Sequence, residues 1–290
     1  MRLSEFLCDA LIRVIRKITP TGKGMWQLAQ MAVRTIDDKA ILRERETIDG
    51  FKMEIRLSCY PDLPMYYGVY EIPTIRLIHR LLSAGDVAID VGANIGYMAL
   101  HMAECVKSAG HVWAFEPVPP TRERLIHNVN NNKCTQVTVM PNAVGEKADD
   151  TVDIYLPIEG ENAHSLSSLS NFTESVKFSV NMVRLDDVVK EKVRLIKIDV
   201  EGGELSVLKG AQEIIAKYAP YIIFEYNKEA LLRFNTKLQD IFDAVILTQT
   251  PYEAFNIDGG MKRINMKKVQ NVNKGKASVN ILLSPVLGGV

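Results

Sequence analysis

The hydrophobic and polar positions of this chain follow two different periods. Short, continuous apolar runs are separated by segments in which apolar residues recur every three or four positions. The runs predict buried strands, and the segments between them predict amphipathic helices. We expect strands at residues 87–91, 112–115, 137–140, 193–200, 221–225 and 279–283, and helices at residues 95–107, 121–131, 204–217 and 237–242. Two further short apolar stretches lie around residues 152–156 and 178–183.

Strands that alternate with helices are typical of a parallel sheet, because each crossover helix returns the chain to the same edge of the sheet. We therefore predict an α/β fold with a mostly parallel, doubly wound sheet. This domain is expected to span residues 51–290, behind an N-terminal helical extension over residues 1–50.

The extension begins with an amphipathic pattern. Over residues 1–18 the apolar side chains recur at helical spacing, with Arg13, Arg16 and Lys17 on the other side. The favoured interpretation is that this basic helix packs on the domain or mediates self-association with a second subunit. The alternative is a peripheral position on an anionic membrane surface, which would suit lipid-linked substrates.

Composition narrows the class of protein. The chain has 290 residues, 35 of them basic and 35 acidic, so no net charge attracts a polyanion and no nucleic-acid partner is expected. The four cysteines form no CxxC pair, which is typical of a reduced, cytoplasmic protein. The sequence has no apolar run of about 18 residues and no signal-peptide core, so neither secretion nor a spanning helix is expected.

The loop after the first predicted strand carries the first chemical signal. Its sequence, DVGANIG, opens the next helix, at the place where open α/β sheets bind ligands. A dinucleotide-binding GxGxxG loop would have glycine where Asp90 stands, and a carboxylate there would repel a pyrophosphate. The same carboxylate would attract the ammonium group of an amino acid, so an amino-acid-bearing cofactor is favoured over NAD.

The second predicted strand ends at Glu116, 20 positions after Gly96. A carboxylate at the end of this neighbouring strand can accept hydrogen bonds from both hydroxyls of a ribose. Together with Asp90, it predicts S-adenosylmethionine as the ligand. The structural alternative is a tight strand-to-helix turn with a capping carboxylate.

Several segments in order resemble a known family. They are IDVGANIGYMAL, WAFEPVPPTRERLIHNVNNN, NAVGE, MVRLDDVV, LIKIDVEGGELSVLKGA and YIIFEYN, and they resemble the FkbM family of methyltransferases over about residues 67–227. Residues 67–71 resemble the family's segment just upstream of the first strand. The resemblance implies a Rossmann-like fold, S-adenosylmethionine as methyl donor and, usually, an oxygen acceptor on a glycan, polyketide or other small molecule.

The resemblance also implies roles for single residues. The family pattern assigns Glu116 to the ribose and places Ser167 and Ser168 in a polar stretch before LDD. The remaining residues implied to bind the donor are Asp90, Gly92, Asn94 and Gly96 in the loop, and Asn142 and Ala143 beside the adenine.

An acidic group follows the later strands. Lys197, Asp199 and Glu201 would share one face of a strand, and Glu225 ends the next one, so all four are candidate catalytic residues. Asp199 is the first choice to accept the proton of a hydroxyl or to orient the acceptor. His164 is an outside candidate.

Two other interpretations of the acidic group stay open. It could bind a divalent cation, which is not favoured, or it could be structural, with Lys197 neutralising Asp199 and Glu204 capping the next helix. No metal-ligating residues are predicted, and His101, His111 and His127 are expected to have packing roles.

The sequence thus predicts a methyltransferase that methylates a hydroxyl of a glycan or other small-molecule or lipid-linked acceptor. The polar segment 159–177 would be a loop or lid over the site. The same donor site could also serve N- or C-methylation. An NAD-binding oxidoreductase and a non-catalytic, methyltransferase-like scaffold are the alternatives from other classes.

Overall fold

The computed structural model describes residues 10, 14, 25–34, 39–148, 150–157, 175–248, 251–267, 272–273 and 275–286. The basic helix predicted for residues 1–18 lies outside these residues, apart from Ala10 and Val14. The polar segment 159–177 is also outside them except for its last three residues, which belong to a strand.

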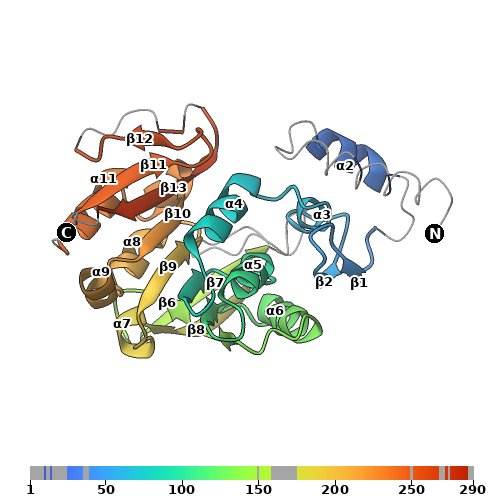
Figure 1. Cartoon of the computed structure of the whole chain (residues 1–290), viewed down its shortest axis with the longest axis horizontal. Coiled ribbons are helices and arrows are strands. Elements are labelled where there is room, and N and C mark those ends of the chain that lie inside the picture. Colours follow the sequence, from blue (N-terminus) through green and yellow to red (C-terminus); the bar gives the residue numbers. More distant parts are fainter. Residues whose placement is uncertain are drawn as a thin grey trace.

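An eight-stranded sheet forms the centre of the fold (Figure 1), with the order β12-β11-β13-β10-β9-β3-β4-β5. Five adjacent strands are parallel: β5 (Val137–Met140), β4 (His111–Phe115), β3 (Val87–Val91), β9 (Val193–Ile198) and β10 (Tyr221–Asn227). The antiparallel strand β13 (Ser278–Pro285) separates β10 from β11 (Tyr252–Asn256), and β12 (Lys262–Ile264) pairs with β11. The strand order reverses at β3, between β4 and β9, which is where such sheets bind ligands.

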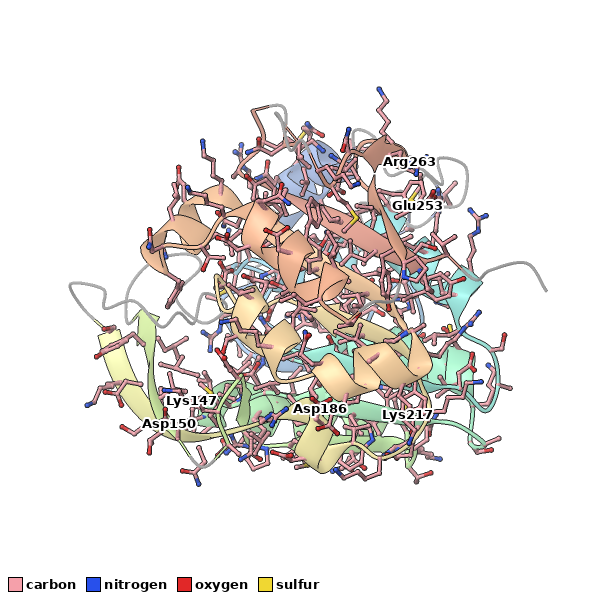
Figure 2. The ribbon with its side chains drawn as sticks, turned by 90° about the vertical axis from the view of Figure 1, so that its left-hand side faces the viewer. Lys147, Asp150, Asp186, Lys217, Glu253 and Arg263 are labelled. Atoms are coloured by element: carbon pink, nitrogen blue, oxygen red, sulfur yellow. The ribbon has the colours of Figure 1, made fainter. Side chains whose placement is uncertain are left out.

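Helices cover both faces of the sheet, which confirms the predicted doubly wound α/β fold (Figure 1). Alternate strand residues show this, because Ala88 packs with Met98 of one helix layer whereas Ile89 packs with Leu208 and Ile215 of the other. Figure 2 looks onto the second layer. The first layer is α4 (Ile72–Leu81), α5 (Tyr97–Val106) and α6 (Pro119–Asn131), and the second is α8 (Glu204–Lys209), α9 (Gln212–Tyr218) and α11 (Leu238–Ile246).

The helix predicted for residues 204–217 is in fact two helices, α8 and α9, so that prediction was wrong. The break falls at Gly210. A Cβ on Gly210 would lie 2.0 Å from the carbonyl oxygen of Gly145, so the backbone of a distant loop occupies the space of a side chain. This close approach and the low helix propensity of glycine both favour ending α8 here.

The family-like motif LDD has a structural role in the short helix α7 (Leu185–Val188). Asp186 (labelled in Figure 2) is buried, and its two oxygens accept the backbone N–H groups of Glu213 (3.1 Å) and Ile214 (3.0 Å). Arg184 pairs with the same carboxylate at 3.1 Å. Asp186 therefore supplies the acceptors that the first turn of α9 requires, and the charge suits the positive end of that helix.

The N-terminal part contains α2 (Met25–Val33), then a hairpin of β1 (Arg43–Glu46) and β2 (Lys52–Ile55), then α3 (Asp62–Tyr66). Met53 and Met65 pack with Ile95 and Leu100, so this part covers α5 beside the sheet. The predicted domain division at residue 50 stays a prediction, and the hairpin spans it.

A second, three-stranded sheet has the order β6-β8-β7. It consists of β6 (Ala143–Val144), β7 (Thr151–Pro157) and β8 (Ser175–Val183), and the short helix α10 (Lys228–Arg233) follows β10. Among the described helices, none combines the length and the apolar character needed to cross a bilayer.

Candidate active site

A cavity of about 1340 Å³, including open space at its mouth, lies where β3, β4, β9 and β10 end. The sequence-predicted residues that line the cavity are Asp90, Gly92, Asn94, Glu116, Asn142, Ala143, Lys197, Asp199, Glu201 and Glu225.

Of the described residues predicted to bind the donor or to act in catalysis, only Gly96 does not line the cavity. It has φ +93° and immediately precedes α5, and a Cβ there would lie 2.5 Å from the side chain of Leu125. Glycine at this position therefore lets α6 approach the start of α5.

Gly92 lines the cavity and also joins two loops. Its φ is +80°, and a Cβ on it would lie 1.9 Å from the carbonyl oxygen of Asp199. Glycine is thus required both by the left-handed backbone and by direct backbone contact between the loop after β3 and the turn after β9. The two parts of the site are held together without an intervening side chain.

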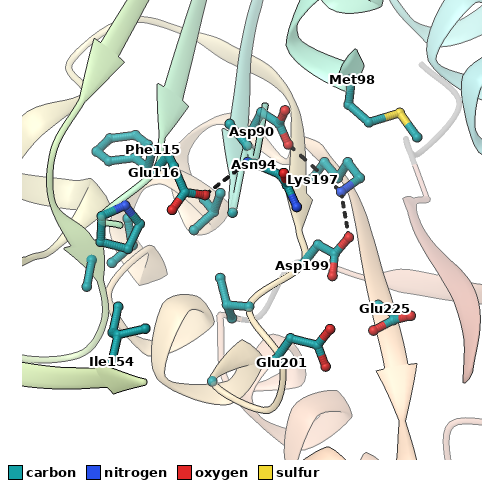
Figure 3. A pocket seen from close by; sticks show the side chains of 18 of the residues that line it. Asp90, Asn94, Met98, Phe115, Glu116, Ile154, Lys197, Asp199, Glu201 and Glu225 are labelled. Carbon is teal, nitrogen blue, oxygen red and sulfur yellow. Dashed lines mark hydrogen bonds and ion pairs between the residues drawn. The ribbon is translucent and has the colours of Figure 1, made fainter. Parts of the chain in front are cut away.

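Glu116 follows β4 and is held by two backbone groups. Its Oε2 accepts the N–H of Asn94 (3.0 Å) and its Oε1 accepts the N–H of Val118 (2.9 Å). The side chain is only 4% exposed, and burial raises its pKa to about 7 despite these hydrogen bonds. The carboxylate is therefore fixed in orientation at one side of the cavity (Figure 3).

Lys197 links the carboxylates of Asp90 and Asp199. Its Nζ lies 3.1 Å from Asp199 Oδ2 and 3.9 Å from Asp90 Oδ1 (Figure 3). Burial acts to lower the pKa of Lys197, but the carboxylates of Asp199, Asp90 and Glu71 outweigh it and raise the pKa above its ordinary value. The lysine is therefore a permanent cation at physiological pH.

Asp90 is completely buried, and no described side chain donates a hydrogen bond to its oxygens, although the backbone N–H of Ala99 is close enough to lower its pKa. Burial raises its pKa to about 6, although Lys197 acts in the opposite direction. A buried carboxylate with open acceptor positions at the wall of a cavity is suited to a cationic hydrogen-bond donor.

Three carboxylates form the opposite side of the cavity, at Asp199, Glu201 and Glu225 (Figure 3). Each offers an oxygen within 4.8 Å of the others. Burial and then Asp199 raise the pKa of Glu201 to about 7 and that of Glu225 to about 9. At neutral pH Glu225 therefore holds a proton.

The prediction that Glu201 shares a strand face with Lys197 and Asp199 was wrong in its geometry. Strand β9 ends at Ile198, and Glu201 has φ +53° in the turn that follows. The turn brings Glu201 to the cavity instead.

The structural interpretation of the acidic group holds in part: Lys197 neutralises Asp199, but the prediction that Glu204 caps the next helix was wrong, because α8 has no side-chain cap. Glu204 serves the turn, since its Oε1 accepts the N–H groups of Gly202 (3.1 Å) and Val200 (3.4 Å). Burial raises its pKa to about 7. Glu204 does not line the cavity, whereas the other acids do.

The sequence did not single out Tyr60, Tyr70 and Glu71 as site residues, although all three line the cavity. Glu71 precedes α4 with φ +41°, and its carboxylate accepts a hydrogen bond from Asn280 at 3.1 Å. Burial raises the pKa of Glu71 to about 7 and that of Tyr60 above its ordinary range. The family-like segment 67–71 was the only sequence signal for two of them.

His164, Ser167 and Ser168 lie outside the described residues. His111 has the expected packing role, because its ring nitrogens contact Glu191 (2.9 Å) and Thr138 (2.8 Å). His127 contacts Asn131 at 2.8 Å. His101 is buried, with one ring nitrogen 3.2 Å from His79.

Comparison with known families gives one match, to the Methyltransferase FkbM domain over residues 90–249, more than half of the chain. Among curated proteins, hexuronic acid methyltransferase AglP of Haloferax volcanii is 34% identical over 140 residues, covering 48% of this chain and 56% of that protein. Methyltransferase sdnD of Sordaria araneosa is 28% identical over 163 residues, covering 46% of this chain and 62% of that protein. The matched region thus spans little more than half the length of these relatives.

Among solved structures, the methyltransferase FkbM from Methylobacillus flagellatus KT is similar to this chain. The sequence identity is 17%, the TM-score is 0.43, and the match covers 76% of this chain and 53% of that one.

Proposed function

Because the chain belongs to the FkbM methyltransferase family, we propose that it transfers a methyl group from S-adenosylmethionine to a hydroxyl oxygen of a glycan or another small molecule. The observation that carries the proposal is the division of one cavity. Glu116 and the loop after β3 form one side, and the three carboxylates form the other, so a donor and an acceptor can meet between them.

The donor side fits S-adenosylmethionine in shape and charge. Glu116 offers a fixed carboxylate for two ribose hydroxyls, and Asp90 offers buried, unoccupied acceptor positions for an ammonium group. Asn142 and Ala143 lie at the same side with the apolar side chains of Val152 and Ile154, which suits the flat face of adenine. A pyrophosphate in this loop would meet the carboxylate of Asp90, which disfavours NAD.

S-adenosylmethionine would supply an electrophilic methyl group on a sulfonium. The chain must then hold the acceptor hydroxyl in line with that methyl group and accept its proton as the new bond forms. We assign this task first to Asp199, because Lys197 fixes its carboxylate at 3.1 Å while the side chain still faces the cavity. Glu201, with a pKa near 7, is the alternative base.

The charge of the acceptor side favours a neutral acceptor. Asp199, Glu201, Glu225 and Glu71 face the cavity there, and Lys197 is already paired with two carboxylates. Glu225 is protonated at neutral pH, but Glu201 and Glu71, with pKa values of about 7, carry part of a negative charge there. An anionic acceptor would be repelled by that charge, whereas the hydroxyls of a neutral sugar can donate hydrogen bonds to these oxygens. We therefore propose a neutral polyhydroxyl acceptor, although a similar protein is named a hexuronic acid methyltransferase. Action in the cytoplasm, without a nucleic-acid partner, remains part of the proposal.

The test begins with calorimetric titration of the protein with S-adenosylmethionine, S-adenosylhomocysteine and NAD. We expect micromolar binding of the first two, about −8 kcal/mol, and none of NAD. Binding of NAD alone would overturn the proposal, and binding of none of the three would favour a scaffold.

Methyl transfer is then measured with labelled donor on neutral glycans and on uronic acids. Asp199→Asn should keep donor affinity and lower turnover by about 10²–10⁴-fold. Asp187→Asn is the matched control, because Asp187 is exposed on α7 and does not line the cavity. Full activity of Asp199→Asn would remove its catalytic role, and preference for uronic acids would contradict the neutral acceptor.

A further inference from the structure

Helices α4 and α5 pack against each other (Figure 1) and bring together three side chains outside the cavity. His79 comes from α4, and His101 and Glu104, three positions apart on α5, share a face of that helix. His79 Nε2 lies 3.2 Å from His101 Nδ1 and 4.0 Å from Glu104 Oε2. One ligand atom from each of the three lies within 4.8 Å of the others.

A carboxylate lies behind the buried ring of His101. The ring is 3% exposed, and its Nε2 lies 3.9 Å from Asp49 Oδ2 without a hydrogen bond to any described residue. The hydroxyl of Tyr97 donates to the same Asp49 oxygen and holds it in place. A carboxylate on this side favours the proton on Nε2, so the lone pair of Nδ1 faces His79 and Glu104.

We propose that His79, His101 and Glu104 bind a divalent transition-metal ion of the zinc type, which joins α4 to α5. Two imidazoles and one carboxylate are a common ligand set for such an ion, with solvent completing the coordination. Bonds of about 2.0–2.1 Å in tetrahedral geometry place ligand atoms about 3.3 Å apart, close to the observed 3.2 Å. Asp49, 3.9 Å from His101 Nε2, would then act as a positioning residue through its charge, and a small shift of the ring would let Nε2–H donate to it, as in the carboxylate–histidine–zinc arrangement.

The surrounding charges restrict the choice of ion. Arg76 and Arg80 line the same hollow as the carboxylates of Asp49 and Glu104, so the hollow has no net negative charge to attract a cation. Calcium and magnesium rely on oxygen ligands, of which the three residues offer one carboxylate. Coordination by imidazole must therefore supply the affinity, which favours zinc, cobalt, nickel or copper.

The site lies behind the cavity rather than in it. Glu71 immediately precedes α4, and Tyr97, which lines the cavity, begins α5. An ion that joins the two helices would therefore stiffen one wall of the cavity without contacting either substrate.

The test uses the full chain, stripped of metal with a chelator. Zn²⁺ is titrated by calorimetry, and Co²⁺ is followed by its visible absorption. We expect one ion per chain, a tetrahedral cobalt spectrum and a higher melting temperature with Zn²⁺. His79→Ala should abolish the binding of the ion, the cobalt spectrum and the rise in melting temperature. Because His79 is exposed, the metal-free variant should have the same melting temperature as the metal-free wild type.

Further variants separate this site from others. Asp49→Asn should weaken Zn²⁺ binding about 10–100-fold. His127→Ala, which removes an exposed histidine on α6, should change nothing, and Asp199→Asn should also retain binding. The proposal fails if the wild type binds no Zn²⁺, if His79→Ala binds it as tightly, or if Asp199→Asn loses it, because the ion would then occupy the cavity carboxylates. The first of these results would leave a plain hydrogen bond between His79 and His101.

Discussion

Replacing Glu225 with glutamine should stabilise the chain, and increasingly so as the pH rises. In the unfolded chain this carboxyl loses its proton near its ordinary pKa of 4.5, but in the folded chain burial, and then Asp199, hold the pKa at about 9. The unfolded state therefore ionises first. The stability that this group confers is complete below about pH 4.5 and is lost as the pH rises towards 9.

The magnitude follows from the shift. Each pH unit within this window costs about 1.4 kcal/mol, so between about pH 5 and pH 8 the wild type should lose up to about 4 kcal/mol through Glu225. Because the side chain of Glu225 is only partly buried, water screens its charge and makes the loss of stability smaller than this value. Glu225→Gln mimics the protonated form at every pH, so its advantage over the wild type should grow by the same amount.

Urea unfolding at about pH 5 and pH 8 measures this difference directly, with free energies from linear extrapolation. Glu123→Gln is the matched control, because Glu123 is exposed on α6 and should show no comparable pH-dependent gain. If Glu225→Gln and Glu123→Gln respond alike between the two pH values, burial does not penalise the charge of Glu225 and the reasoning is wrong.

Three further substitutions test parts of the structure. Gly92→Ala must bear the strain of positive φ, about 1–2 kcal/mol, and also displace the Asp199 carbonyl. Gly50→Ala, with φ +88° and nothing within 4 Å, should show the strain alone, so equal urea midpoints would contradict the contact. Glu116→Ala should weaken S-adenosylmethionine binding roughly 100-fold in calorimetry through two lost charged hydrogen bonds, and unchanged affinity would remove the ribose role. Asp186→Ala should lower the free energy of unfolding by about 3–5 kcal/mol, because α9 loses its capping carboxylate. Asp187→Ala, on the exposed side, should change that free energy by less than about 0.5 kcal/mol. Similar melting temperatures of the two variants would argue against the cap on α9.

The central strands were predictable because burial on both faces leaves continuous apolar runs. Strands β3 and β5 begin and end where the pattern predicts. The break between α8 and α9 was not predicted, because Gly210 alone only weakens a helix and the Gly145 backbone that packs against it lies 65 positions earlier. Strand β1, with the sequence RERE, has no apolar alternation and is defined by its pairing with β2.

The candidate site was predictable as far as it follows the sheet. Asp90, Glu116 and Glu225 end or follow neighbouring strands, so their meeting at one edge follows from parallel pairing. Glu71 lies at the start of α4, a helix that the sequence pattern did not predict, so its position at the cavity was not predicted either. His79 and His101 meet because α4 packs on α5. The periodicity of one helix shows which of its faces is apolar but not which residues of another helix it contacts.

The carboxyls with raised pKa also make the cavity a proton reservoir. Near neutral pH, Glu116, Glu201 and Glu225 retain protons that a cation placed among them would expel, because a positive charge lowers the pKa of a neighbouring acid. S-adenosylmethionine carries a sulfonium charge and S-adenosylhomocysteine does not. Loading the donor would then release protons into solvent, and converting it to the neutral thioether would take them back, so each catalytic cycle carries a proton exchange in addition to the methyl transfer. At alkaline pH, where more of these acids are ionised, the affinity of the neutral spent donor would therefore fall below that of the cationic donor.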